Sequence, residues 1–379
     1  MAKQQAVTDI LRQYHPVPDR FDELGTGGSG PKSHWRPLLQ QLNLESVAGL
    51  NLRAQAVSNA IAEDGVTYNV YEDPRGDTRP WEVDLLPLVL GADEWQWLSK
   101  AVAQRAELLD SVLADLYGEQ SLLKEGLMPP ALVYGQAGFQ WPCQGIQPAG
   151  GRFLHLYAVD LARAPDGGWW VMADRTQAPS GAGYALQNRL VISRAFPAPF
   201  HNLPVTNLSE FFQGFQNSLA GMSPAGTESP LCVLLTPGRF NETYFEHVFL
   251  ARYLGLPLVE GQDLTVRDDT VYLKTLQGLR RVHAIYRRLD DGFCDPLELR
   301  ADSVLGIPGL LGAVRAGKVL MANALGSGVL ESAALFGFLP EISKKLLGSP
   351  LAMPSVASWW CGEKPALDYV IEHLDELVI

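Results

Sequence analysis

The sequence predicts a mixed α+β and α/β fold, with a helical N-terminal part, an antiparallel meander and an α/β lobe in that order. Residues 93–117 carry apolar side chains at helical spacing, and Gly118 ends the pattern. Between residues 131 and 194, short runs rich in β-branched and aromatic residues are separated by the turns PDGG and PSGAG. Beyond residue 230, strand and helix patterns alternate, beginning with the continuous apolar run LCVLLTP, which is typical of a strand buried on both faces.

The part before the α/β lobe is predicted to be mainly helical at first and then antiparallel. A short helix is expected over residues 1–14, then a loop rich in Gly and Ser, and then a helix over residues 38–63. The segment VTYNVYE alternates like a strand. In the meander, the three expected strands are FLHLYAVDLAR, GWWVMADR and RLVISRAF, and Asp166, Gly167 and Gly168 make a hairpin turn between the first two.

The α/β part is predicted to follow the linker GMSPAGTESP at residues 221–230. TYFEHVFLARYLG is expected to be a helix, with Thr243 and Glu246 in capping-box spacing and Gly255 at its C-terminal end. The further strands expected are LPLVEG, VYLKT, VHAIYRR and KVLMA, and ESAALFGFLPEISKKLLG is expected to be a helix. The domains expected along the chain are an N-terminal helix with a Gly-rich loop (1–35), a helical part with the antiparallel lobe (36–220), the linker (221–230), the α/β lobe (231–362) and the start of a further segment (363–379).

Composition and charge exclude several classes of function. The 30 Lys and Arg residues against 42 Asp and Glu give a net charge of −12, which argues against nucleic-acid binding because that depends on clustered cations. The apolar runs fall short of the roughly 20 residues that span a membrane, and the first residues lack the apolar stretch of a signal peptide. The four cysteines lack disulfide or zinc spacing, so we expect reduced, mostly buried thiols. We therefore expect a cytoplasmic protein without nucleic-acid or membrane partners.

Glycine-rich turns are the first candidates for a ligand site. GTGGSG matches the dinucleotide-binding pattern at Gly25, Gly27 and Gly30, but no strand precedes it and Pro31 follows it, so we interpret it as a loop. NALGSGV (323–329) and LLTPGRFNE (234–242) each follow an expected strand, and at the ends of parallel strands the two turns would face one crevice. Each turn either offers backbone N–H groups to an anion or serves as a packing turn, and both alternatives stay open.

The charged segment at residues 160–189 is the most informative part of the sequence. Asp174 and Arg175 end an expected strand, the small-residue loop PSGAG follows, and Asn188 and Arg189 open the next expected strand. Aspartate and asparagine oxygens suit Mg²⁺, and arginines can neutralise phosphate oxygens. The alternative is a surface Asp–Arg pair beside a tight turn.

Two other features have plainer interpretations. The mixed charges of RRLDD (287–291) end an expected strand and are interpreted as solvated surface. Trp95 and Trp97 are interpreted as core residues of the long helix, and Arg105 on the same helix is a weaker functional hint.

Four of these segments together resemble one known family. DRTQAPSGAGYALQNR, LTPGRFNETYFEHVFLARYLGLPLVEGQDLTV, RRLDDGFCDPLELR and NALGSGVLESAALFGFLP are similar to the circularly permuted ATP-grasp type 2 family, whose members often carry the label glutathionylspermidine synthase. The resemblance runs from about residue 21 to residue 379. It implies an ATP-grasp fold whose catalytic lobe comes early in the chain and whose α/β part is a Rossmann-like pre-ATP-grasp substrate lobe. It also implies a ligase that uses ATP and Mg²⁺ to join a carboxylate to an amine through an acyl phosphate.

The resemblance further implies roles for individual residues. The implied metal ligands are Asp174, Gln187 and Asn188. The arginines implied to attend the phosphates or the acyl phosphate are Arg175 and Arg189. The residues implied to bind the nucleotide are Arg163, Ser180, Gly181 and Gly183. The residues implied to bind substrate are Asn241, Glu242, Arg288, Asn323, Gly326 and Gly328.

Two departures from the family's pattern accompany the resemblance. The family implies an acidic residue immediately before Asn188, where this chain has Gln187, which keeps an oxygen but loses a negative charge. The family also implies a lysine-bearing segment beyond HLDELVI that clamps the nucleotide, so we expect a C-terminal segment or a partner protein to complete the ATP site. The first hypothesis is the ligase, acting on small-molecule or peptide carboxylates and amines. The alternative is a non-catalytic ATP-grasp-like binding or scaffold protein.

Overall fold

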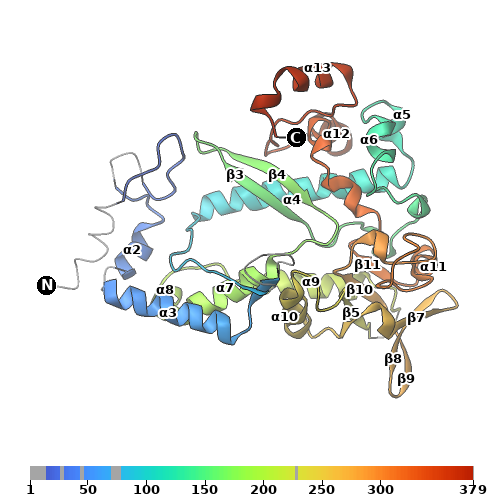
Figure 1. The fold of residues 1–379 in the computed structure, drawn as a ribbon, viewed down its shortest axis with the longest axis horizontal. Coiled ribbons are helices and arrows are strands. Elements are labelled where there is room, and N and C mark those ends of the chain that lie inside the picture. The colour runs from blue at the N-terminus through green and yellow to red at the C-terminus, as the bar shows by residue number, and fades with distance from the viewer. Residues whose placement is uncertain (1–13, 26–29, 43–46, 70–77, 227–228, 379) are drawn as a thin grey trace.

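The computed structural model describes residues 14–25, 30–42, 47–69, 78–226 and 229–378. In Figure 1 the N-terminal helices lie at one end of the molecule and the α/β lobe at the other, with a long helix and a β-hairpin between them. The helix expected over residues 1–14 lies outside the described residues except for Tyr14, and Gly27 also lies outside them. No helix of the described ranges is long and apolar enough to cross a membrane.

The N-terminal part is helical, as predicted, and the described residues form two helices in the range where one was expected. Helix α2 spans Arg36–Leu42 and α3 spans Val47–Glu63, and the short strands β1 (Thr67–Asn69) and β2 (Thr78–Pro80) pair antiparallel. Apolar side chains from α2 and α3 pack against helix α7 (Ala182–Ala195), with Leu42, Ile61 and Val191 in one buried cluster. Residues far apart in sequence therefore form this end of the molecule.

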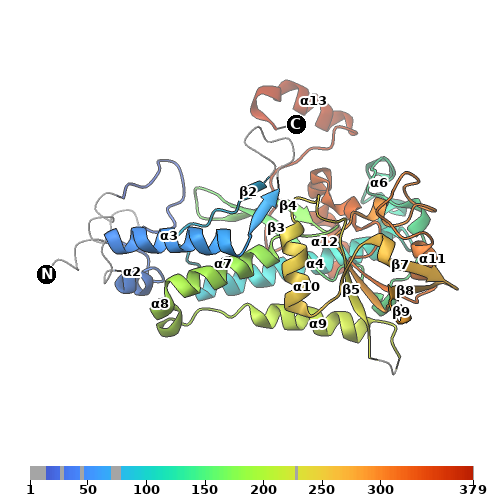
Figure 2. The ribbon, with the colours of Figure 1, turned by 60° about the horizontal axis from the view of Figure 1, so that its bottom comes forward.

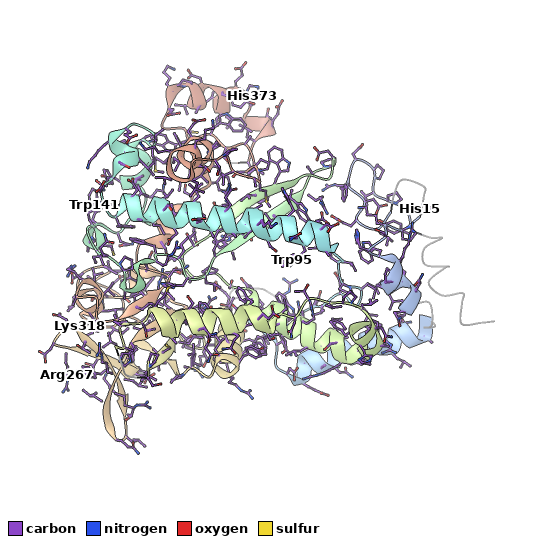
Figure 3. The ribbon with its side chains drawn as sticks, turned by 180° about the vertical axis from the view of Figure 1, so that it is seen from behind. His15, Trp95, Trp141, Arg267, Lys318 and His373 are labelled. Atoms are coloured by element: carbon purple, nitrogen blue, oxygen red, sulfur yellow. The ribbon has the colours of Figure 1, made fainter. Side chains whose placement is uncertain are left out.

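Helix α4 (Ala92–Leu116) is the long amphipathic helix that the sequence predicts over residues 93–117. Its buried side chains recur every three or four residues and include Leu98, Arg105 and Leu109. Trp95 and Trp97 were expected in the core, but they are 49% and 43% exposed, and Figure 3 shows Trp95 near the end of the helix. That prediction was wrong because both side chains precede Leu98, the first buried residue of α4. The short helices that follow are α5 (Ser121–Lys124), α6 (Pro130–Tyr134), η2 (Trp141–Cys143) and η3 (Ala149–Gly151).

Two strands of the expected meander form a hairpin, and the third is a helix. Strands β3 (Ala158–Arg163) and β4 (Trp169–Arg175) pair antiparallel around the predicted turn. RLVISRAF belongs to α7, so the strand predicted there was wrong. Its β-branched residues Val191 and Ile192 suggest a strand, but both are buried on one helical face against the N-terminal helices. Helices α8 (Pro197–Asn202) and α9 (Ser209–Met222) come next.

The α/β lobe contains a parallel sheet in the order β6–β5–β10–β11, formed by Leu258–Val259, Cys232–Leu235, Ala284–Arg287 and Leu320–Ala322. Alternate residues of β5 enter two different cores: Val233 packs towards α4 and α11 (Leu310–Arg315), and Leu234 packs towards α9 and α10 (Tyr244–Leu254). The chain leaves β5 towards β6 through α10, and it leaves β10 towards β11 through α11 on the opposite face. The order therefore reverses between β5 and β10, where open α/β sheets usually bind ligands.

The remaining elements surround this sheet. An antiparallel sheet projects from the lobe in Figure 2 and consists of β7 (Leu264–Arg267), β8 (Thr270–Thr275) and β9 (Gly278–Arg281). The last segments are η4 (Gly261–Asp263), η5 (Asp291–Phe293), η6 (Ser327–Glu331), η7 (Ala333–Gly337), α12 (Leu339–Leu347), α13 (Lys364–Glu372) and η8 (Leu374–Glu376). The helix expected from residue 331 is thus broken into η7 and α12. Helix α9 precedes the predicted linker but packs on the parallel sheet, and the division into domains stays a prediction.

Three of the four cysteines are buried and all four are free thiols, as predicted. Burial raises the pKa of both Cys143 and Cys294 to about 12, so these thiols stay protonated near neutral pH.

Candidate functional site

The candidate site lies at the C-terminal ends of the parallel strands. Residues 174–183, from the end of β4 to the start of α7, meet these strand ends. Asn323 follows β11 and is 2% exposed. Its Oδ1 accepts hydrogen bonds from the backbone N–H groups of His155 (2.8 Å) and Leu156 (2.9 Å), and its Nδ2 donates to the carbonyls of Leu156 and Thr176, both at 2.7 Å. The amide implied to bind substrate is therefore fully engaged in holding the base of the hairpin.

Asp174 forms a buried ion pair on the inner face of β4. Its two carboxylate oxygens each lie 2.7 Å from a nitrogen of Arg105, and Tyr157 donates its hydroxyl to Oδ1 at 2.5 Å. The Arg105 and Asp174 side chains are 2% and 1% exposed. Burial disfavours the charged guanidinium, but the bonds and charge of Asp174 outweigh it and raise the pKa of Arg105. Burial and the Asp174 charge likewise raise the pKa of the Tyr157 hydroxyl.

The PSGAG loop is held by a carboxylate of the protein itself. The N–H groups of Gly181 and Gly183 each donate to Glu246 Oε1 at 2.8 Å, and Arg288 Nη2 lies 3.1 Å from Glu246 Oε2. Glu246 is fully buried, and a Cβ atom at Gly183 would lie 2.7 Å from Glu246 Cγ. The capping box predicted for Glu246 with Thr243 was wrong, because this carboxylate satisfies the start of α7 instead.

A carboxylate also accepts the backbone N–H groups of the turn after β11. Asp291 Oδ2 accepts from the N–H groups of Gly326 at 3.1 Å and Gly328 at 3.3 Å. Asp291 and Arg288 are 4% and 5% exposed, so the interpretation of RRLDD as solvated surface was wrong for them, whereas Asp290 is exposed as predicted. Glu331 Oε1 accepts from the backbone of Thr176 and Gln177, both at 2.7 Å. The carboxylates of Glu246 and Glu331 thus fasten residues 176–183 along the sheet edge, and that of Asp291 fastens the turn after β11.

The three implied metal ligands have three different sets of partners. Asp174 pairs with Arg105, Gln187 donates Nε2 to Asp64 at 2.6 Å, and Asn188 accepts from Trp81 Nε1 at 2.8 Å. In the part of the chain that the structure describes, no group of three or more His, Cys, Asp or Glu side chains could hold a metal ion. Because both Asp174 oxygens already accept bonds from Arg105, the residues present do not fit a Mg²⁺ site.

The implied phosphate-binding arginines also have partners. Arg189 donates to the Thr206 carbonyl at 2.8 Å. Arg163 pairs with Glu23 at 2.9 Å and with Glu94 at 2.5 Å. Arg175 differs, because it points away from the core and pairs with Asp160 at 2.8 Å, with both side chains 52% exposed. Ser180 is exposed as well.

The switch point between β5 and β10 is acidic. Asn241 caps the turn before α10, with its Oδ1 accepting from the Thr243 N–H at 3.0 Å and hydroxyl at 2.9 Å. Glu242 is exposed. Burial raises the pKa of Asp290, and the charges of Asp291 and Glu242 raise it further, while Arg287 and Arg288 oppose the shift. Acidic side chains from both strand ends therefore influence one another here.

Sequence reasoning missed the carboxylates that bind the backbone N–H groups of the turns. Glu246 was assigned to a local cap and Asp291 to solvent, and Glu331 was not singled out. Their partners lie 65, 37 and 155 residues away in the chain, so no local pattern marks them. The available signal was a set of acidic residues beside small-residue turns that leave backbone N–H groups unpaired.

Comparison with known proteins gives one family. The model of the family described as circularly permuted ATP-grasp type 2 matches residues 87–379. An uncharacterized protein of Synechocystis sp. is 37% identical over 369 residues, which is 97% of this chain and 76% of that protein. Two uncharacterized proteins of Mycobacterium tuberculosis are 38% and 34% identical over 95% of this chain, which spans 42% and 64% of their lengths.

A solved structure shares the fold. A glutathione synthetase-like effector from Globodera pallida, in its apo form, superposes with a TM-score of 0.53 at 12% identity, covering 88% of this chain and 79% of the effector. Sequence and fold comparisons therefore agree on one architecture.

Proposed function

The chain belongs to the circularly permuted ATP-grasp type 2 family, and from that premise we propose that it is part of an ATP- and Mg²⁺-dependent ligase that joins a carboxylate to an amine through an acyl phosphate. ATP-grasp domains are generally ATP-dependent ligases, so the family itself suggests this coarse activity. Bound ATP and Mg²⁺ would supply the phosphoryl group and neutralise its charge.

The observation that supports the proposal best is the outer face of the β3–β4 hairpin. Trp170 and Met172 are 36% and 45% exposed on this face, beside the half-exposed pair of Arg175 and Asp160. An isolated two-stranded sheet is marginal, and exposed apolar side chains on one commonly mark a surface that binds something. A surface ion pair is worth only about 0 to 1 kcal/mol, so a phosphate could replace Asp160 on Arg175.

The substrates would approach from the C-terminal edge of the parallel sheet. Glu242 and Asp290 at the switch point would favour a cationic amine. Most ligands of the Mg²⁺ would be ATP phosphates and water, since the described residues do not form a Mg²⁺ site of their own. This chain spans 42–76% of the three relatives' lengths, and we propose that a C-terminal segment or a partner protein completes the ATP site.

Calorimetric titration of ATP with and without Mg²⁺ tests the proposal. We expect a saturable Mg²⁺-dependent heat, and Arg175→Gln should weaken it about tenfold or more, because a hydrogen bond to a charged group is worth about 1.5–3 kcal/mol. Arg267→Gln is the matched control: Arg267 is exposed at the end of β7, far from the hairpin (Figure 3). Absence of binding would exclude a ligase that works with these 379 residues alone.

One observation favours the alternative, a non-catalytic binding or scaffold protein. The N–H groups that would receive phosphate at Gly181, Gly183 and Gly326 are already bonded to Glu246 or Asp291. A scaffold of this kind would form no ADP and would bind its partner equally well with Arg175→Gln.

A further inference from the structure

A groove of about 640 Å³ lies beside the contact between α7 and α10, away from the hairpin. One wall is the α7 stripe of Gln187, Leu190 and Arg194, which recur at helical spacing. The opposite wall is α10, and the corner between α3 and β1 closes a third side with Asp64. Figure 2 shows α3 and α7 running alongside each other, with α10 beside the N-terminal end of α7. The volume lies within the usual range of small-molecule pockets.

Three aromatic side chains, Phe245, Phe249 and Tyr253, line the α10 wall. The Phe245 and Phe249 ring centroids are 5.7 Å apart with an interplanar angle of 24°, and those of Phe249 and Tyr253 are 6.3 Å apart at 8°. Aromatic residues four apart usually pack into a core, but here all three line an open groove and Tyr253 is 44% exposed. Aromatic rings that line an open groove offer π-faces and edges against which a planar ligand can pack.

The charges of the groove favour an anion although the whole chain is acidic. Arg194 and Arg252 come from the last turns of α7 and α10, against one carboxylate, Asp64. Asp64 lies 3.7 Å from Arg194 in a pair whose side chains are 39% and 66% exposed, and it also accepts from Gln187. Among the described residues, the Arg252 guanidinium has no hydrogen-bond or ion-pair partner, so it is available to a ligand.

We propose that this groove binds a small ligand that combines a planar aromatic ring with an anionic group, in the size range of a nucleoside monophosphate. The ring stacks on Phe249 and its neighbours, and the anion pairs with Arg252 and displaces Asp64 from Arg194. The groove shares no lining residue with the outer hairpin face of Asp160, Trp170, Met172 and Arg175, so the proposal does not rest on the ligase. It needs no divalent metal, because the groove supplies the positive charge itself.

Binding of AMP to the full chain in EDTA, followed by calorimetry, tests this proposal. Saturable binding should weaken about tenfold or more in Arg252→Gln, through loss of a charge-assisted hydrogen bond. It should weaken about fivefold or more in Phe249→Leu, through loss of stacking. Arg267→Gln and Arg175→Gln should bind AMP as the unchanged chain does, and the second control separates this groove from the proposed ligase site.

Two smaller ligands test the contributions of the ring and of the anion separately. Adenosine lacks the anion and ribose 5-phosphate lacks the ring, so each should bind at least tenfold more weakly than AMP. The proposal is overturned if AMP shows no saturable binding, if Arg252→Gln leaves its affinity unchanged, or if ribose 5-phosphate binds as tightly as AMP. Because Mg²⁺ is absent throughout, none of these results bears on Mg²⁺-dependent ATP binding at the hairpin.

Discussion

The two faces of the β3–β4 hairpin carry chemically identical ion pairs in opposite surroundings. Asp174 and Arg175 are neighbours at the end of β4, and strand geometry sends their side chains to opposite sides. Asp174 meets Arg105 at 1–2% exposure, whereas Arg175 meets Asp160 at 52%. The buried pair holds α4 and the hairpin together. In the exposed pair, Arg175 can exchange Asp160 for a ligand.

This contrast changes how variants at the site should be interpreted. Asp174 is the first metal ligand that the ATP-grasp resemblance implies. Its removal, however, would leave the buried guanidinium of Arg105 without its charge partner. A loss of activity in such a variant would follow from unfolding as readily as from a missing ligand. Arg175 carries no such ambiguity, because its side chain is half exposed.

The largest expected effect is that of Asp174→Ala on stability. Breaking a buried pair by removing one partner typically costs 3–5 kcal/mol, because the remaining charge is uncompensated. We expect the free energy of unfolding, measured in urea, to fall by about that amount. A loss below about 1 kcal/mol would show that Arg105 finds another partner and would remove the distinction between the two faces.

A double variant sharpens the same comparison. Arg105→Met with Asp174→Leu removes both charges, and replacing a buried pair by apolar residues is often neutral. Tyr157 loses its acceptor, which costs about 1–3 kcal/mol, so we expect partial recovery relative to Asp174→Ala. If the double variant is stable but has lost Mg²⁺-dependent ATP binding, Asp174 has a functional role in addition to holding α4 and the hairpin together.

The contrast between buried and exposed groups extends to histidine. Burial, with the charge of Arg288 adding to it, lowers the pKa of His247 to about 2, whereas His201, at the end of α8, lies exposed on the surface. The unfolded chain binds a proton at His247 near pH 6.5 and the folded chain does not, so stability is complete above pH 6.5 and falls as the pH drops towards 2.

We therefore expect the free energy of unfolding to fall more steeply in the unchanged chain than in His247→Gln. The difference should be about 1.4 kcal/mol per pH unit between pH 6 and pH 4, measured by urea unfolding. His201→Gln is the control and should follow the unchanged chain. Parallel profiles for all three proteins would mean that His247 is protonated in the folded state.

The elements that could be predicted from sequence are those specified by their own residues. Helix α4 follows from its apolar period, β5 from a continuous apolar run, and the end of α10 from Gly255, which has a φ of 65°. The same local signals failed for α7, whose β-branched residues are buried by helices over a hundred residues earlier in the chain. Tertiary packing overrides a local preference of this size.

The candidate site was less predictable than the fold, for a physical reason. The NALGSG and LLTPGRFNE turns both follow strands of the parallel sheet, as predicted, but the sequence does not show what occupies the backbone N–H groups of the glycine-rich turns. Glu246 reaches Gly181 across 65 residues, and Asn323 reaches Leu156 across 167. Such contacts depend on the assembled fold, so composition and spacing indicate the donors without revealing the acceptors.

The smallest expected effect on stability belongs to the exposed pair. Asp160→Asn should change the free energy of unfolding by less than about 1 kcal/mol, and 0.5 M salt should remove most of that change by screening. The same variant frees Arg175, so Mg²⁺-dependent ATP binding, if it occurs on the outer face, should become a few-fold tighter. Calorimetry of both variants tests this surface, because ATP should bind more tightly to Asp160→Asn and more weakly to Arg175→Gln than to the unchanged chain. A stability loss near 3 kcal/mol would mean that the outer pair is as structural as the inner one, because only a desolvated pair costs that much to break.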